Sequence, residues 1–136
     1  MAFGTGFGGA SAYTQVAVET SVASADPHTL ILLLFEGAEA AIRLAKFKML
    51  EKDIPAKGNA ISQAIQLVTD GLRASLDIEA GGELAERLAA LYDYIAARLL
   101  WANLKNDVAA LDECLNLLGE IHSAWTEISP EKQAAA

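Results

Sequence analysis

The chain has 136 residues, 53% of them hydrophobic, which is enough to bury the core of one compact domain. It carries 10 Lys and Arg against 18 Asp and Glu, and this net charge of -8 would repel the phosphate backbone of nucleic acid or an anionic lipid surface. The single cysteine, Cys114, forms neither an intrachain disulfide nor a CxxC metal site. Composition therefore argues against nucleic-acid binding and favours a reducing compartment.

The N-terminal region is expected to be mobile. Residues 1–12 contain four glycines among small and polar neighbours, and residues 13–24 follow no clean helical or strand period. Gly4, Gly6 and Gly9 formally match GxGxxG, but that motif binds dinucleotides only between a strand and a helix, and three residues cannot form the strand. We therefore predict a flexible arm and an irregular strap over residues 1–25.

No segment resembles a membrane anchor or a signal peptide. The most apolar run, residues 30–35, is far shorter than the roughly 20 residues that span a bilayer. The N-terminus lacks the basic start and apolar stretch of a signal peptide. These patterns predict a cytosolic protein without stable membrane insertion.

Two helices are predicted in the first half of the bundle. Asp26-Pro27 begins the first, because aspartate caps free amides and proline at the next position loses no helical hydrogen bond. Its apolar residues recur at steps of three and four as far as a break at 53–55. The second helix is expected over residues 58–77, with glycines at 81 and 82 ending the segment.

Two further helices are predicted in the second half. One begins near Glu83 and ends at Asn106, and the next begins at Asp107 and ends before Ser129-Pro130. Four helices of similar length joined by short loops must alternate in direction. We therefore predict an all-α, antiparallel up-down four-helix bundle over residues 26–130, with a mobile N-terminal strap and a disordered tail at 131–136.

No constellation of residues predicts catalysis or a cofactor. The only histidines, His28 and His122, stand outside any HExxH or Glu-x-x-His pattern and are expected at helix ends or on the surface. Asp93 lies opposite the apolar stripe of the third helix and is expected to be solvated. The chain is therefore predicted to be no enzyme and to bind no metal or cofactor.

The second helix is apolar over more than half its circumference. Counting 100° per residue, we assign one stripe to the core: Ile61, Ile65, Val68, Leu72 and Leu76. A second row stands about 100° away: Ala60, Ala64, Leu67, Gly71, Ala74 and Ile78. Because several of these side chains are small, the row suits a shallow trough for a partner helix. The alternative is that a bundle helix packs on two neighbours and needs a wide apolar arc.

The third helix has a similar excess. Its predicted core stripe consists of Leu84, Leu88, Leu91, Ile95, Leu99 and Ala102. Behind that stripe stand Ala89, Ala90, Ala96, Ala97, Leu100 and Leu104. Alanine is a good helix former on any face, so this second row also fits a purely structural role.

The sequence resembles the flagellin export chaperones of the FliS type. The likeness covers about residues 12–130, in the same order, and rests on these segments: AYTQVAVET (12–20), the helix start at 26–31, LLFEGA (33–38), AKGNAISQAI (56–65), LDIEAGGELA (76–85), LYDYI (91–95), ANLKND (102–107) and AWTEISP (124–130). It implies an antiparallel helical bundle that binds the disordered C-terminal segment of flagellin in the cytoplasm. Such a chaperone blocks premature polymerisation and delivers flagellin to the flagellar type III export gate, where FlhA is the expected partner.

The resemblance assigns roles to the residues singled out above. The expected flagellin-binding groove is formed by Ala60, Ala64, Leu67, Gly71 and Ala74, with Tyr92, Ala96 and Leu100 on the neighbouring helix. By resemblance only, Tyr13 and Val16 belong to the strap or to export-gate docking. The alternative is a helical scaffold or regulatory adaptor that binds a folded flagellar or export protein. The sequence leaves open whether the chain forms a homodimer.

Overall fold

The molecule is an all-α four-helix bundle, as predicted. The structure is a computed structural model that describes residues 26–128. Its elements are α2 (Pro27–Leu50), α3 (Ile54–Gln66), a π-helical segment η1 (Leu67–Arg73) that continues α3, α4 (Ile78–Lys105) and α5 (Val108–Thr126). Within this range no strand is present. The predicted strap at 1–25 and tail at 131–136 lie outside the described residues.

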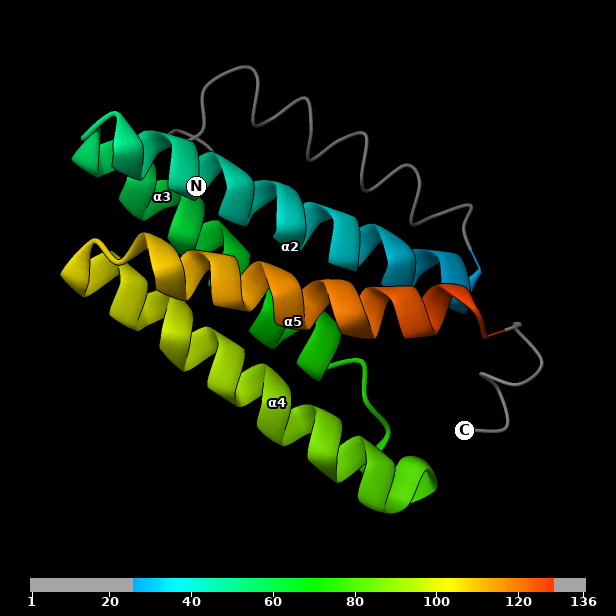
Figure 1. The fold of residues 1–136 in the computed structure, drawn as a ribbon. Helices are drawn as coiled ribbons and strands as arrows, with labels where there is room; N and C mark the ends of the chain where they lie inside the picture. Colours follow the sequence, from blue (N-terminus) through cyan, green and yellow to red (C-terminus); the bar gives the residue numbers. More distant parts are fainter. Residues whose placement is uncertain (1–25, 129–136) are drawn as a thin grey trace, which may run out of the picture.

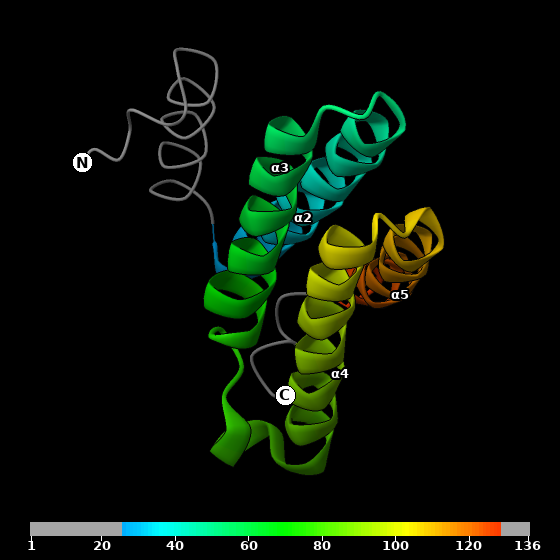
Figure 2. The ribbon, with the colours of Figure 1, turned by 90° about the vertical axis from the view of Figure 1, so that its left-hand side faces the viewer.

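The helices form a closed ring of neighbours that alternate in direction (Figures 1 and 2). The α3–η1 helix packs against both α2 and α4, and α5 also packs against both of them. The helices α2 and α4 stand on opposite sides of the ring and share no close backbone contact, although both contribute buried side chains to the same core. Figure 1 places the α2–α3 turn and the α4–α5 turn at the same end of the bundle, called the loop end below. No helix in the described range is long and apolar enough to cross a membrane.

Each of the four helical segments begins at an aspartate. The carboxylates of Asp26, Asp53, Asp77 and Asp107 accept hydrogen bonds from the backbone N–H three residues later, at 2.7, 3.2, 3.0 and 3.2 Å respectively. Such caps satisfy amides that have no partner within the helix and contribute about 1 kcal/mol each. The predicted starts at Asp26 and Asp107 are confirmed. Asn106 ends α4 in the left-handed conformation, so one helix ends where the next is capped.

The second helix differs from its predicted range of 58–77. It begins at Ile54, because Asp53 and Pro55 form a start like that of Asp26-Pro27 rather than a break. After Gln66 the helix widens into η1, where the N–H of Ala74 donates to the carbonyl of Thr69 five residues back. A π-helical turn holds about one extra residue. Residues after η1 are therefore rotated out of the register that a uniform 100° step predicts.

The start of α4 also differs from the prediction at Glu83. A helical turn already begins at Ile78 behind the Asp77 cap. Gly82 interrupts the helix with φ 56° and ψ -134°, a conformation that glycine adopts without a steric penalty. The predicted helix start thus corresponds to the straight part of α4 beyond this kink.

The core stripe of α4 is rotated from its predicted position. Ile95, Leu99 and Ala102 are buried as expected, but Leu84 is 62% exposed. In the N-terminal half, the buried residues are Ala85, Ala89 and Tyr92, each one position away from the predicted Leu84, Leu88 and Leu91. Burial raises the pKa of the Tyr92 hydroxyl to about 12. Burial likewise raises the pKa of the Cys114 thiol to about 12, so this core cysteine is a protonated, unreactive thiol at neutral pH.

A buried lysine near the start of α3 forms hydrogen bonds with the C-terminal end of α4. Lys57 is 4% exposed, and its ammonium donates to the Asn103 carbonyl at 3.0 Å and to Asn106 Oδ1 at 2.5 Å. Both acceptors belong to the C-terminal turn of α4, where backbone carbonyls lack helical partners and attract a cation. Lys57 therefore fixes α3 to the end of α4.

Replacing Lys57 with Met should lower the free energy of unfolding by about 2 kcal/mol, because two oxygen acceptors lose a charged donor that is itself buried. Urea unfolding followed by circular dichroism measures this change. The matched control is Lys48→Met, since Lys48 forms a partly exposed ion pair with Glu51 and a contact with the exposed Phe47 ring, and its loss should change stability by less than about 0.5 kcal/mol. Equal stability of the Lys57→Met variant and the natural protein would show that this contact contributes nothing.

Candidate functional site

Part of the predicted groove lies in the core. Ala60 is 3% exposed, Ala64 0% and Tyr92 4%, and all three belong to the central hydrophobic cluster. The expectation that they form an open trough is wrong for this structure. The physical reason is the ring of helices: α3 packs on two neighbours, so it buries the row of small residues together with Ile61 and Val68.

In the next part of the second apolar row, at Leu67 and Gly71, two glycines allow α2 and η1 to pack closely. A Cβ atom on Gly71 would lie 3.0 Å from Leu34 Cδ2, and one on Gly37 would lie 3.3 Å from Leu67 Cδ1. Each glycine thus accommodates a leucine from the facing helix, and α2 and η1 approach closely because of it. Gly71 and Leu67 therefore contribute to the contact between α2 and η1, although both keep some exposed surface.

The remaining predicted groove residues are accessible. Ala74 is exposed just after η1, Ala96 is half-buried, and Leu100 is 52% exposed. Leu67 and Gly71 face α2, whereas Ala96 and Leu100 belong to α4, which stands on the opposite side of the ring from α2. The eight predicted residues therefore do not line one common groove, and their role in binding stays a prediction.

The solvent face of α4 carries an apolar surface instead. We call it the α4 outer stripe and define it by five residues: Tyr94, Ala97, Leu100, Trp101 and Leu104. All are exposed, including Leu104 at 71%. At 100° per residue they fall in an arc of about 120° opposite the buried face. A helix that is apolar on both faces inside a small domain indicates a docking surface for another chain.

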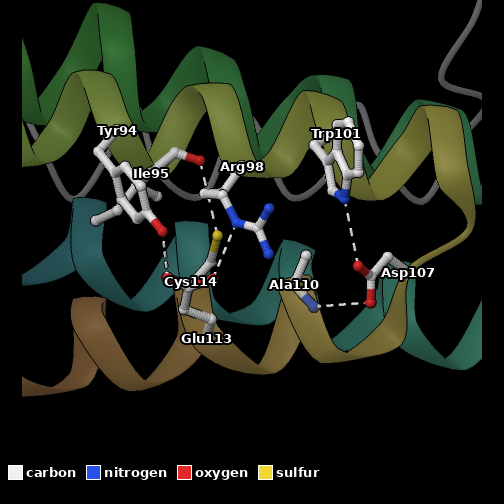
Figure 3. A network of polar contacts seen from close by, with 8 residues as sticks. All are labelled: Tyr94, Ile95, Arg98, Trp101, Asp107, Ala110, Glu113 and Cys114. Atoms are coloured by element: carbon white, nitrogen blue, oxygen red, sulfur yellow. Dashed lines mark hydrogen bonds and ion pairs between the residues drawn. The ribbon is translucent and has the colours of Figure 1, made fainter.

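Polar contacts hold the aromatic side chains of the stripe in place (Figure 3). The Tyr94 hydroxyl donates to Glu113, which also accepts from Arg98 Nε at 2.9 Å. The Trp101 indole N–H donates to Asp107 Oδ2 at 3.3 Å, and the same carboxylate caps α5. The hydrogen bond from Tyr94 and the Arg98 guanidinium together lower the pKa of Glu113, which stays ionised at neutral pH. These contacts restrict the Tyr94 and Trp101 rings in the free molecule.

One acidic residue interrupts the stripe. Asp93 lies in the same arc of α4 as the stripe and is exposed to solvent, as predicted. Its carboxylate also accepts two hydrogen bonds from the Arg73 guanidinium of η1, at 2.6 and 3.3 Å. The pair links η1 to α4 and neutralises the charge beside the apolar surface. The pairing with Arg73 could not be predicted from the sequence, because the two residues are 20 positions apart and no local pattern joins them.

Both histidines lie near the end of the bundle opposite the loop end, and neither is exposed. His28 stacks on Trp125 with ring centroids 5.1 Å apart, and the Trp125 indole N–H donates to the His28 carbonyl at 3.2 Å. His122 stacks on Phe35, and its Nδ1 lies 2.9 Å from Glu39 Oε2. These contacts join the start of α2 to the end of α5. In residues 26–128 no group of three or more His, Cys, Asp or Glu side chains is arranged to hold a metal ion.

The fold and the α4 outer stripe define a class of helical bundle that presents an ordered apolar helix face for protein binding. The model of the family described as flagellar protein FliS matches residues 9–132. The chain is 50% identical over 123 residues to the flagellar secretion chaperone FliS of Salmonella typhimurium, covering 90% of this chain and 91% of the relative. It is 46% identical over 117 residues to the flagellar secretion chaperone FliSB of Pseudomonas aeruginosa, covering 86% and 92%. The chain belongs to the FliS family of flagellar secretion chaperones.

Proposed function

We propose that this chaperone binds the disordered C-terminal segment of flagellin in the cytosol and that the α4 outer stripe is a principal contact. The single observation that supports this site is the exposure of Leu100, Leu104 and Trp101 on a helix whose opposite face is already buried. Apolar residues at steps of three and four suit a partner that forms a helix as it binds. Occupation of this segment would prevent premature polymerisation of flagellin.

The stripe alone is too small for a partner that folds on binding. From Tyr94 to Leu104 it spans eleven residues and about 15 Å, and it offers roughly a few hundred Å² of apolar surface. Coupled folding and binding usually buries about 1,000–3,000 Å². We therefore propose that the flagellin segment continues over neighbouring surfaces that include Leu67, Ala74 and Ala96. Ala60, Ala64 and Tyr92 join the contact only if helices separate.

The proposed delivery step involves the export gate. By resemblance to the family, the chaperone with bound flagellin docks on FlhA, and Tyr13 and Val16 contribute to that contact or to the strap. Both residues lie outside the described residues. This part of the proposal therefore rests on the family and not on geometry.

Calorimetric titration with monomeric flagellin, and with flagellin that lacks its C-terminal segment, tests the proposal. Removing the segment should weaken binding by at least about a hundredfold, which is about 2.7 kcal/mol, because that segment forms most of the interface. Hydrogen exchange should show that backbone amides of the segment become protected in the complex. Equal affinity for both flagellins would overturn the proposal. Binding without new protection would favour the adaptor alternative, in which the partner is already folded.

A further inference from the structure

A second exposed apolar surface lies at the loop end, on the side of α2 and α5. We call it the loop-end patch and define it by Phe47, Leu50, Ile54, Val108 and Leu115. Phe47 is 56% exposed and Leu50 63%. Two hollows of about 450 and 390 Å³ meet at Leu50, which lines both of them. Hollows beside protruding apolar side chains can accept the side chains of a docking segment.

Basic residues surround this patch although the protein is acidic. Lys52 lines the larger hollow, and Arg43 and Lys46 line the smaller one. The loop-end half of the bundle, residues 40–63 and 95–117, contains seven of the ten Lys and Arg of the chain and five acids. The other described residues contain two Lys and Arg and eleven acids. Charge is therefore separated along the bundle, with its positive end at the loop-end patch.

The ion pairs at this end leave the cations available to a ligand. Lys46 contacts Asp112 at 2.8 Å and Lys48 contacts Glu51 at 3.2 Å, but all four side chains are partly exposed to solvent. Such exposed pairs contribute at most about 1 kcal/mol and can exchange partners. Lys52 has no ion pair within the described residues.

Lys52 has an unusual backbone conformation where it lines the larger hollow. Lys52 has φ 63°, in the left-handed region that residues other than glycine and asparagine rarely adopt. The turn would be less strained with glycine or asparagine at this position. The left-handed residue closes the end of α2, because the N–H of Asp53 donates to the carbonyl of Lys48 at 3.0 Å.

We propose that the loop-end patch binds an acidic amphipathic helix of a second protein, separate from the flagellin segment. Leucine-like side chains of this helix fill the two hollows beside Leu50, and its carboxylates face Arg43, Lys46 and Lys52. The patch is formed by residues of α2, α3 and α5, whereas the α4 outer stripe consists only of residues on the exposed face of α4. One chaperone therefore binds flagellin and the second protein together.

A designed peptide tests this proposal with the full-length protein. The probe is a fluorescent helix-forming peptide of about 18 residues with leucines at steps of three and four and glutamates elsewhere; its matched control carries lysines in place of the glutamates. Fluorescence anisotropy should detect binding of the glutamate peptide, about tenfold stronger than that of the lysine peptide. The affinity should fall as salt is raised to about 0.5 M.

Amino-acid substitutions distinguish binding at the loop-end patch from nonspecific binding of the peptide. Phe47→Ser combined with Leu50→Ser should weaken binding of the glutamate peptide at least about tenfold. Leu84→Ser removes a leucine of similar exposure in the acidic half and should change nothing. Lys52→Asn should weaken binding severalfold while leaving the melting temperature equal or higher, because asparagine tolerates the left-handed backbone.

Three results would overturn the proposal. The first is equal or absent binding of both peptides, and the second is full affinity of the Phe47→Ser, Leu50→Ser variant. The third is displacement of the glutamate peptide by saturating flagellin C-terminal segment, which would make the patch part of the flagellin site. Undiminished peptide binding in the presence of flagellin supports a separate site. Because this titration needs no flagellin to detect the peptide, its outcome is independent of the proposed flagellin contact.

Discussion

Replacing Ala64 with glutamate is expected to unfold the bundle or to lower its free energy of unfolding by about 4 kcal/mol or more. The side chain at this position is 0% exposed and lies in the central hydrophobic cluster, so the new carboxylate would have neither water nor a cation beside it. Since small domains are stable by only about 5–15 kcal/mol, a loss of this size removes much of the folded population.

Urea unfolding and circular dichroism at low temperature measure the effect of Ala64→Glu. Ser62→Glu is the matched control, because Ser62 is exposed on the same helix and should change stability by less than about 0.5 kcal/mol. An unchanged free energy of unfolding in the Ala64→Glu variant would contradict the placement of this residue in the core. Loss of flagellin binding in this variant would therefore report unfolding and could not identify a groove.

The largest expected effect on binding follows from changing two leucines of the α4 outer stripe. Leu100→Ser combined with Leu104→Ser should weaken binding of the flagellin C-terminal segment about thirtyfold. Each leucine is half-exposed or more, and burying the exposed part in an interface contributes about 1 kcal/mol. The stability of the free bundle should change little, because neither side chain is buried in it.

Calorimetric titration of the double variant, with thermal unfolding of the same sample, separates binding from folding. Leu84→Ser serves as the matched control on the same helix: Leu84 is comparably exposed, but helical spacing places it roughly opposite the stripe. This control should keep the natural affinity. If the double variant bound flagellin as tightly as the natural protein, the stripe would have no part in the interface.

Much of the fold could be predicted from local sequence signals. Asp26-Pro27 and Asn106-Asp107 marked helix boundaries correctly because capping depends on a few adjacent residues. The start at Ile54 was missed, although Asp53 and Pro55 are the same kind of signal, because the pair was interpreted only as a break. The π-helical segment could not be predicted from the periodicity, because a uniform step of 100° per residue assumes α-helical geometry throughout.

The position of the buried arc could not be predicted from one helix alone. On α3 two apolar rows adjoin each other, and periodicity does not tell which one faces the core. Ala60 and Ala64 are buried because neighbouring helices pack over them. Position 71 requires a small residue because Leu34 occupies the space beside it. Which face of a helix is buried thus depends on the helices around it, and the sequence of that helix alone does not specify their positions.

The sequence contains signals for both the α4 outer stripe and the loop-end patch. The excess of apolar residues on the third helix included Ala97, Leu100 and Leu104, all of which belong to the α4 outer stripe. Tyr94 and Trp101 complete it and could have been added from their spacing. The loop-end patch was detectable as well, because residues 43–57 combine five Lys and Arg with exposed apolar positions.

Site-specific photocrosslinking can show whether flagellin touches the α4 outer stripe, because it reports contact without depending on affinity. A benzoylphenylalanine placed at Ala97, in the middle of the exposed face of α4, should crosslink on illumination to the C-terminal segment of flagellin. The same group at Ser62, exposed on α3, is the comparison position. Mass spectrometry of the crosslinked peptide is expected to place the contact from Ala97 within the C-terminal segment. A complex with natural affinity that yields no crosslink from Ala97, or only crosslinks to other parts of flagellin, would contradict the account.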